Sequence, residues 1–315
     1  MPAPDFQIHQ NQLPCATSAE GISVRTDVLA TDEKGENKSS VQKHTTKILR
    51  KLGPILQSIL LPNELVLYAL RARSPLSLVE QFTAAWWTRA LAACAIIVTN
   101  TRILFFPIKT DGSWRESVLA VQWGDVEEIR VNGFLTLQAR FRFKNGTTAT
   151  YTALRRVDAK KLAAMAAALI PVASGEQTAR HGPAHLCPDC REALEDGQYF
   201  CENCRLTFKD EKTMILRSVF LPAGGYFYTG HPLIAILPAI VEIIFVFNLL
   251  LALYGGLTSH RRPTEFLGVL LILVAFWAIE TAITILHCRR YIRDFIPDRR
   301  NASRVHAGAV PKLGD

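Results

Sequence analysis

The chain has 315 residues, of which 49% are hydrophobic and 20% are charged, and its formal net charge is +8. This length predicts two or three folded units, and the composition excludes a collagen, a coiled coil and a wholly disordered chain. The mean hydropathy of +0.14 averages unlike segments, because most of the apolar excess lies between residues 232 and 286. A purely soluble globular protein is therefore not expected.

The N-terminal region over residues 1–40 is polar and acidic and has no lasting periodicity. We therefore predict a disordered tail. This region also lacks the uninterrupted apolar core of a secretory signal, which favours a cytoplasmic N-terminus.

Residues 41–62 place apolar side chains at helical spacing, with Lys47, Arg50 and Lys51 largely off that stripe. The pattern predicts a basic amphipathic helix, which Pro54 breaks or kinks near its middle. Such a helix either lies on an anionic membrane leaflet, with these three basic residues as candidate lipid ligands, or packs on the next domain.

Residues 63–171 show the period of two that is typical of β-strands, and the clearest alternation runs from Leu135 to Lys144. Asn145 and Gly146 follow and predict the positive φ angles of a tight hairpin turn. An alanine-rich helix over residues 156–170 closes the segment. The order is thus six or seven antiparallel strands and then one helix.

This segment resembles the bacterial PH-like and GRAM-like families in the runs IIVTNTRILFFPIK and VQWGDVEEIRVNG, the Asn-Gly hairpin and the terminal helix. The resemblance implies an α+β PH-like barrel, which is a scaffold for binding lipids or proteins. Family members that bind phosphoinositides use basic residues in the first strand loop. Arg71 and Arg73 stand near the corresponding place, so the resemblance makes them candidate lipid ligands.

Two C-x-x-C pairs follow a linker over residues 172–186, and their members are Cys187, Cys190, Cys201 and Cys204. The two-residue gap lets both sulfurs of a pair reach one ion at about 2.3 Å in tetrahedral geometry, and thiolates select zinc or iron over magnesium or calcium. Residues 187–210 therefore predict a small zinc ribbon with a structural Zn²⁺ ion, with a redox dithiol and a rubredoxin-like iron site as alternatives. The pattern resembles short bacterial zinc ribbons, in which Gly usually follows each pair, whereas Arg191 and Arg205 stand there.

Two apolar stretches, residues 232–257 and residues 264–287, are long enough to cross the ~30 Å hydrocarbon layer. They predict an α-helical transmembrane hairpin. The preceding residues 211–231 contain LPAGGYFYTGHP, which resembles the entry of small two-helix membrane families and predicts an interfacial segment.

Positive charge on the flanks of this hairpin indicates its orientation. Six arginines follow the second stretch, between residues 287 and 304, whereas the turn of the hairpin holds only Arg261 and Arg262. The excess places both termini in the cytoplasm, with residues 288–315 as a basic tail. The families that the chain resembles imply a bacterial inner or plasma membrane.

Glu242 and Glu280 lie inside the two apolar stretches, where a carboxyl group is expensive. They either form part of a proton or ion relay, or they are hydrogen-bonded groups that fix helix packing or a homo-oligomer interface.

No catalytic motif is found, because the chain lacks Gly-x-Ser-x-Gly, His-Glu-x-x-His and a nucleotide-binding loop. We therefore predict a non-enzymatic, membrane-anchored adaptor or sensor that binds anionic lipid headgroups or a protein partner through the PH-like domain. The alternative is a subunit of an oligomeric ion or proton transport system that uses Glu242 and Glu280. Nucleic acid is not an expected partner, since acidic residues interrupt the basic ones beside the cysteines.

Overall fold

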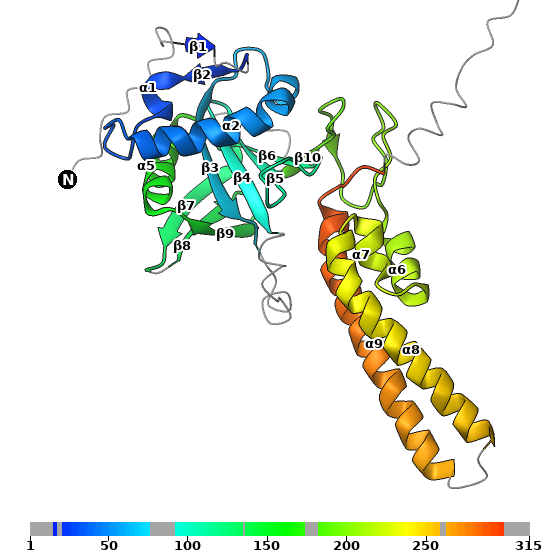
Figure 1. Ribbon diagram of the computed structural model, residues 1–315. Helices are drawn as coiled ribbons and strands as arrows, with labels where there is room; N and C mark the ends of the chain where they lie inside the picture. The colour runs from blue at the N-terminus through cyan, green and yellow to red at the C-terminus, as the bar shows by residue number, and fades with distance from the viewer. Residues whose placement is uncertain are drawn as a thin grey trace, which may run out of the picture. The chain divides into compact units, whose positions relative to one another are not determined.

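The computed structural model describes residues 15–17, 21–75, 92–134, 136–173, 182–258 and 263–298 (Figure 1). The chain divides into two compact units, Met1–Cys204 and Arg205–Asp315.

The first unit is built on a curled antiparallel sheet, a half-barrel. Its main strands are β3 (Val66–Arg73), β4 (Ala93–Thr99), β5 (Arg102–Pro107), β6 (Val118–Gln122), β7 (Val126–Asn132), β8 (Leu137–Phe143) and β9 (Thr148–Leu154). Their spatial order is β6-β5-β4-β3-β9-β8-β7, so two antiparallel meanders meet where β3 pairs with β9. The remaining elements of this unit are β1 (Cys15–Thr17), β2 (Ser23–Arg25), α1 (Thr26–Leu29), α2 (Ser39–Ile59), the 3-10 turn η1 (Trp123–Asp125), α5 (Arg156–Ala173), β10 (Ala184–Leu186) and β11 (Ala193–Leu194).

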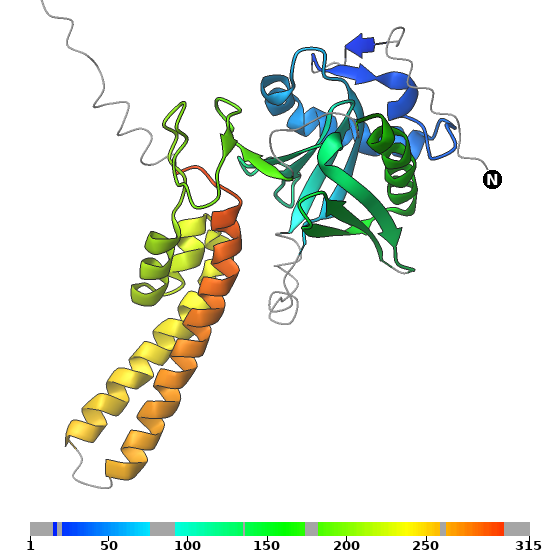
Figure 2. The same ribbon diagram turned by 180° about the vertical axis from the view of Figure 1, so that it is seen from behind.

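Helices cover both faces of this sheet, and each face has its own hydrophobic cluster. On the inner face, Phe105, Phe141 and Tyr151 belong to one hydrophobic cluster with Leu162 and Met165 of α5, the terminal helix. Figure 2 shows α5 beside the sheet. The outer face is covered by α2, whose buried stripe is Leu49, Leu52, Leu56 and Ile59. Strands β4 and β5 are therefore apolar on both faces, which explains their continuous runs of Val, Ile, Leu and Phe.

The predicted alternation is present in β8, where Ala139, Phe141 and Phe143 are buried while Arg140 and Arg142 are exposed. The predicted hairpin also joins β8 to β9. Of its two central residues only Gly146 has a positive φ, of 81°, so the turn does not place Asn145 in the left-handed region. Leu135 lies outside the described residues.

The packing of α2 decides between the two interpretations of the basic amphipathic helix. Its apolar stripe is buried against the half-barrel, so that stripe is not available to a membrane, and its bounds are Ser39–Ile59 instead of 41–62. The helix continues through Pro54, so of the predicted break or kink the break is absent. Burial of the stripe on the sheet outweighs the cost of a proline inside a helix, which is about 3 kcal/mol.

The segment before α2 corrects the predicted disordered tail, because residues 21–40 are folded. Val24 of β2 pairs with β3 in parallel, and Val28 of α1 is buried in the inner cluster. The carbonyl oxygens of Val28 and Thr31 accept hydrogen bonds from the buried ammonium of Lys161 on α5. Residues 21–40 contain too few apolar residues to show a helical or strand period in the sequence. Tertiary contacts hold this segment in place.

The last residues of the predicted linker over residues 172–186 are also folded. Residues 184–186 form β10, which pairs antiparallel with β6 and adds a strand to the sheet before the first cysteine pair. The cysteine segment is thus joined to the half-barrel by backbone hydrogen bonds.

The second unit consists of α6 (Glu211–Phe220), α7 (Gly224–Thr229), α8 (Pro232–Thr258) and α9 (Pro263–Arg293). The predicted interfacial segment forms α6 and α7, which pack on α9, and α8 and α9 form the predicted hairpin (Figure 1). Helix α9 continues past residue 287 to Arg293, and the backbone of residues 296–298 then pairs with that of residues 207–209. The first part of the predicted basic tail is therefore folded.

Candidate functional site

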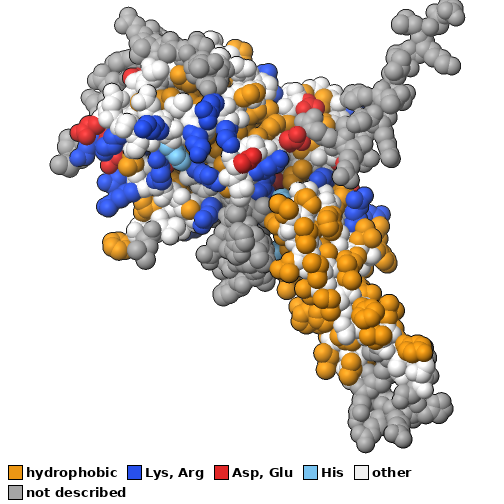
Figure 3. Space-filling model, viewed as in Figure 1, with side chains coloured by type: hydrophobic (Ala, Val, Ile, Leu, Met, Phe, Trp, Pro, Cys, Tyr) orange, Lys and Arg blue, Asp and Glu red, His pale blue; other side chains and the backbone are white. Residues whose placement is uncertain are grey.

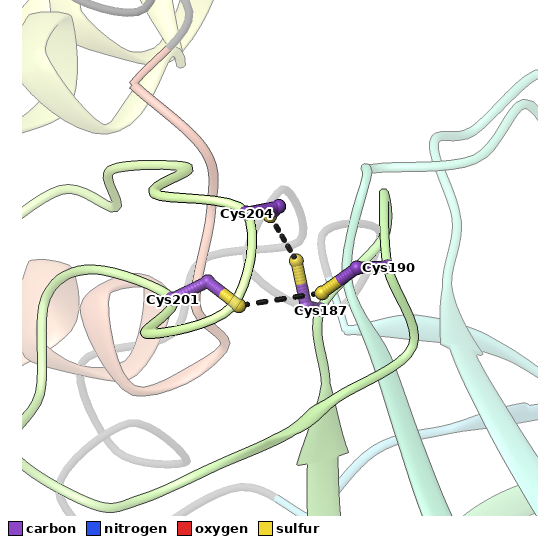
Figure 4. A group of neighbouring side chains, drawn as sticks. All are labelled: Cys187, Cys190, Cys201 and Cys204. Atoms are coloured by element: carbon purple, nitrogen blue, oxygen red, sulfur yellow. Dashed lines mark hydrogen bonds between the residues drawn. The ribbon is translucent and has the colours of Figure 1, made fainter.

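The structure brings the four predicted cysteines together (Figure 4). The Sγ atoms of Cys187 and Cys204 are 3.5 Å apart, those of Cys190 and Cys201 are 3.4 Å apart, and all four lie within 4.8 Å of one another. Four sulfurs at about 2.3 Å from one ion would be separated by about 3.8 Å, and a disulfide would require about 2.05 Å. The four thiols can therefore hold one metal ion.

Backbone N–H groups point at these sulfurs. The N–H groups of Asp189 and Cys190 donate to Cys187, and the N–H of Glu192 donates to Cys190. Burial nevertheless raises the pKa of the Cys187 thiol. Burial also acts to raise the pKa of the Cys190 thiol. There the hydrogen bonds to the sulfur outweigh burial, and the pKa of Cys190 is lowered. A bound cation would displace the proton of the buried Cys187, because metals bind the thiolate.

The residues that follow the two cysteine pairs adopt a backbone conformation that favours glycine. Arg191 and Arg205 have φ angles of 66° and 62°, in the left-handed region. A side chain there costs roughly 1–2 kcal/mol relative to glycine. The arginines therefore preserve the shape of the two loops at the cost of strain.

The candidate lipid ligands lie on one basic face of the half-barrel. Exposed Lys47, Arg50 and Lys51 lie on α2, opposite its buried stripe, and exposed Arg71 and Arg73 lie on the end of β3. Figure 3 shows lysine and arginine side chains gathered on the face that carries α2. Lys51 donates a hydrogen bond to the carbonyl oxygen of Asp111, so it also braces the loop after β5.

In the second unit, α8 and α9 contain two spans, Pro232–Gly255 and Leu267–Arg293, with mean hydropathies of 2.6 and 2.4. By length and composition both are able to cross a membrane. Their large apolar side chains are mostly exposed, as the orange surface in Figure 3 shows.

Glu242 and Glu280 meet near the end of the hairpin where α7 packs. The Glu280 carboxyl lies within hydrogen-bonding reach of Glu242. Glu242 is 3% exposed, and its Oε2 accepts a hydrogen bond of 3.0 Å from the backbone N–H of Ala223. This carboxyl group thereby ties the loop before α7 to α8. Sequence patterns did not reveal the contact, since the donor is a backbone group.

The same end of the hairpin holds two further polar contacts. The Tyr226 hydroxyl and His287 Nδ1 are 2.7 Å apart, and the rings of His231 and Tyr291 lie 4.2 Å apart. The glycine pair of the entry motif permits this packing: a Cβ at Gly224 would lie 2.0 Å from the carbonyl oxygen of Arg217.

No protein-family model matches the chain, and no curated protein matches it. Among solved structures, the crystal structure of the C-terminal domain of an unknown protein from Leishmania infantum aligns with 42% of this chain and 98% of that domain. Its sequence identity is 11% and its TM-score is 0.25, values too low to indicate a common fold.

Replacing Arg191 by Gly should slow the loss of metal to a competing chelator, because glycine removes the roughly 1–2 kcal/mol of strain from the first cysteine loop. Arg191→Ala is the matched control, since alanine removes the same charge but keeps the strain. Equal release rates for the glycine and alanine variants would show that the left-handed backbone is not a constraint on this site.

Replacing Gly224 by Ala should lower the thermal unfolding midpoint of the full chain in lipid nanodiscs, since the new methyl group meets backbone and the cost of overpacking is about 1–3 kcal/mol. Gly255→Ala serves as the control, because a Cβ there has no heavy atom within 4 Å. Identical midpoints for the two variants would contradict the close packing of α7 against α6.

Proposed function

We propose that this chain is a non-enzymatic, membrane-anchored adaptor or sensor, whose half-barrel is a cytoplasmic PH-like domain that binds anionic lipid headgroups or a protein partner. The observation that carries the proposal is the apolar surface of α8 and α9. Side chains as large as Leu233, Tyr254 and Ile272 are exposed by 84%, 69% and 70%. Such a surface is costly in water and favourable in hydrocarbon.

The flanks of the hairpin support its orientation. Arg289, Arg290 and Arg293 fall in the last two turns of α9, and the excess of arginine at this end favours the cytoplasmic side. Leu216 and Phe220 of α6 are exposed beside the same end, as expected for a helix at the membrane surface. Both termini would then lie in the cytoplasm.

The strand order supports the PH-like interpretation of the first unit. Two antiparallel meanders of four and three strands are followed by one helix, α5, that covers the inner face. This is the order that the sequence resemblance implies. The exposed basic face supplies the charge that an anionic headgroup would need.

The cysteine cluster supports a structural zinc ion. All four coordination positions would be filled by protein, so the ion would have no open position for water or substrate. The sulfurs belong to two loops joined to the sheet through β10. When bound, zinc would fix these loops to each other.

The contact between Ala223 and Glu242 supports a packing role for the intramembrane carboxyls more than the alternative, an oligomeric transport subunit. Hydrocarbon offers no acceptor to a free backbone N–H group. A carboxyl group inside the protein can supply that acceptor. Glu242 is thus already engaged in holding α7.

Photo-crosslinking of the full chain in native membranes tests the adaptor proposal. A photoreactive residue at Lys47, on the basic face, should yield lipid adducts or one discrete protein adduct. The same residue at Lys144, an exposed lysine in the turn between β8 and β9, is the control. Adduct patterns that are identical at the two positions would show that the basic face is not a binding surface.

A further inference from the structure

A cavity of about 310 Å³ opens on the first unit beside α2. The polar residues that line it are His44, Arg71, Arg73, Thr110 and Arg155, and the rest of its lining is alanine. These residues come from four separate places in the chain: helix α2, the end of β3, the loop after β5 and the residue before α5. No carboxylate lines the cavity among the described residues.

Two arginines of the cavity lie on the outer side of the sheet. Side chains alternate along β3, and Leu70 and Ala72 lie in the inner cluster while Ala69 lies in the outer one. Arg71 and Arg73 therefore share the outer face with α2. Since α2 is an addition to the seven strands and terminal helix of a PH-like barrel, a site that contains His44 is specific to this architecture.

Positive charge in the cavity is compensated only in part. Arg155 donates to both oxygens of Asp158, at 2.7 Å each, and Asp158 also accepts a hydrogen bond from Tyr68. Arg71 and Arg73 make no side-chain hydrogen bond or ion pair with the described residues. Within the described part of the chain, one carboxylate thus stands against three guanidinium groups, an arrangement that attracts an anion.

His44 adds a further polar group to the cavity. Its Nε2 atom is buried without a hydrogen-bond partner among the described residues. Burial lowers the pKa of His44, and the positive charges of Arg155, Arg71 and Lys47 lower it further. The negative charge of Asp158 opposes this shift. An anion in the cavity would also oppose this shift and could accept a hydrogen bond from the ring.

We propose that this cavity binds a phosphate group, carried either by a lipid headgroup or by a small soluble compound. Guanidinium groups match the oxygens of a phosphate with paired N–H donors, and several donors around one anion suit its tetrahedral shape. The volume exceeds that of phosphate alone and leaves room for the group that bears it. The lipid form of the proposal rests on the proposed function, whereas the soluble form does not.

Two probes separate the two sources, each applied to the full chain purified in detergent. Isothermal titration calorimetry with inorganic phosphate tests the soluble form. Native mass spectrometry with phosphatidic acid, which carries a phosphate monoester, or with phosphatidylcholine as the reference lipid tests the headgroup form. Arg73→Gln removes one guanidinium from the cavity, and Arg140→Gln makes the same change at an exposed position of β8.

We expect Arg73→Gln to weaken the binding of at least one probe tenfold or more and Arg140→Gln to change it less than twofold. His44→Gln should also weaken that binding, which separates a site from general loss of charge. Binding of inorganic phosphate without preference for phosphatidic acid would support the cavity and count against lipid recognition by the adaptor. Equal effects of Arg73→Gln and Arg140→Gln on both probes, or no binding of either probe, would overturn the proposal.

Discussion

The apolar side chains exposed on α8 and α9 impose the strictest constraint on this molecule. Their exposure to water costs free energy, whereas their exposure to hydrocarbon does not. Polar groups of a hairpin in hydrocarbon are stabilised when they find partners within the protein. That preference accounts for the end of the hairpin where Glu242 accepts from Ala223 and His287 meets Tyr226. It also accounts for Gly224, since only a residue without a Cβ lets the short helices approach closely enough to supply those partners.

A different constraint shapes the first unit, in which the β3–β6 part of the sheet is apolar on both faces. Helix α5 covers one face and α2 covers the other. Because the apolar stripe of α2 is buried against the sheet, the basic side of this helix is exposed, on the same face as Arg71 and Arg73. The helix thereby contributes at once to the stability of the half-barrel and to the charged face and cavity on which the proposed binding depends.

Features encoded by short-range patterns could be predicted from the sequence. The spacing of Cys187 to Cys204 indicated a common site, and the length of the apolar stretches indicated the hairpin. The folding of residues 21–40 was missed because it depends on contacts such as Lys161 with Val28, 133 residues apart. His44 and Arg155 were missed for the same reason: each is unremarkable in its own segment, and only the packing of α2 beside β3 and β9 brings them to one cavity.

Extraction of native membranes with alkaline carbonate tests membrane anchoring most directly. High pH weakens binding through the basic face but does not weaken burial of α8 and α9 in hydrocarbon, so the full-length chain should remain in the membrane pellet. A matched peripheral protein held by charge alone should be released under the same conditions. Recovery of the full-length chain in the supernatant would contradict a transmembrane hairpin, and with it the anchored adaptor.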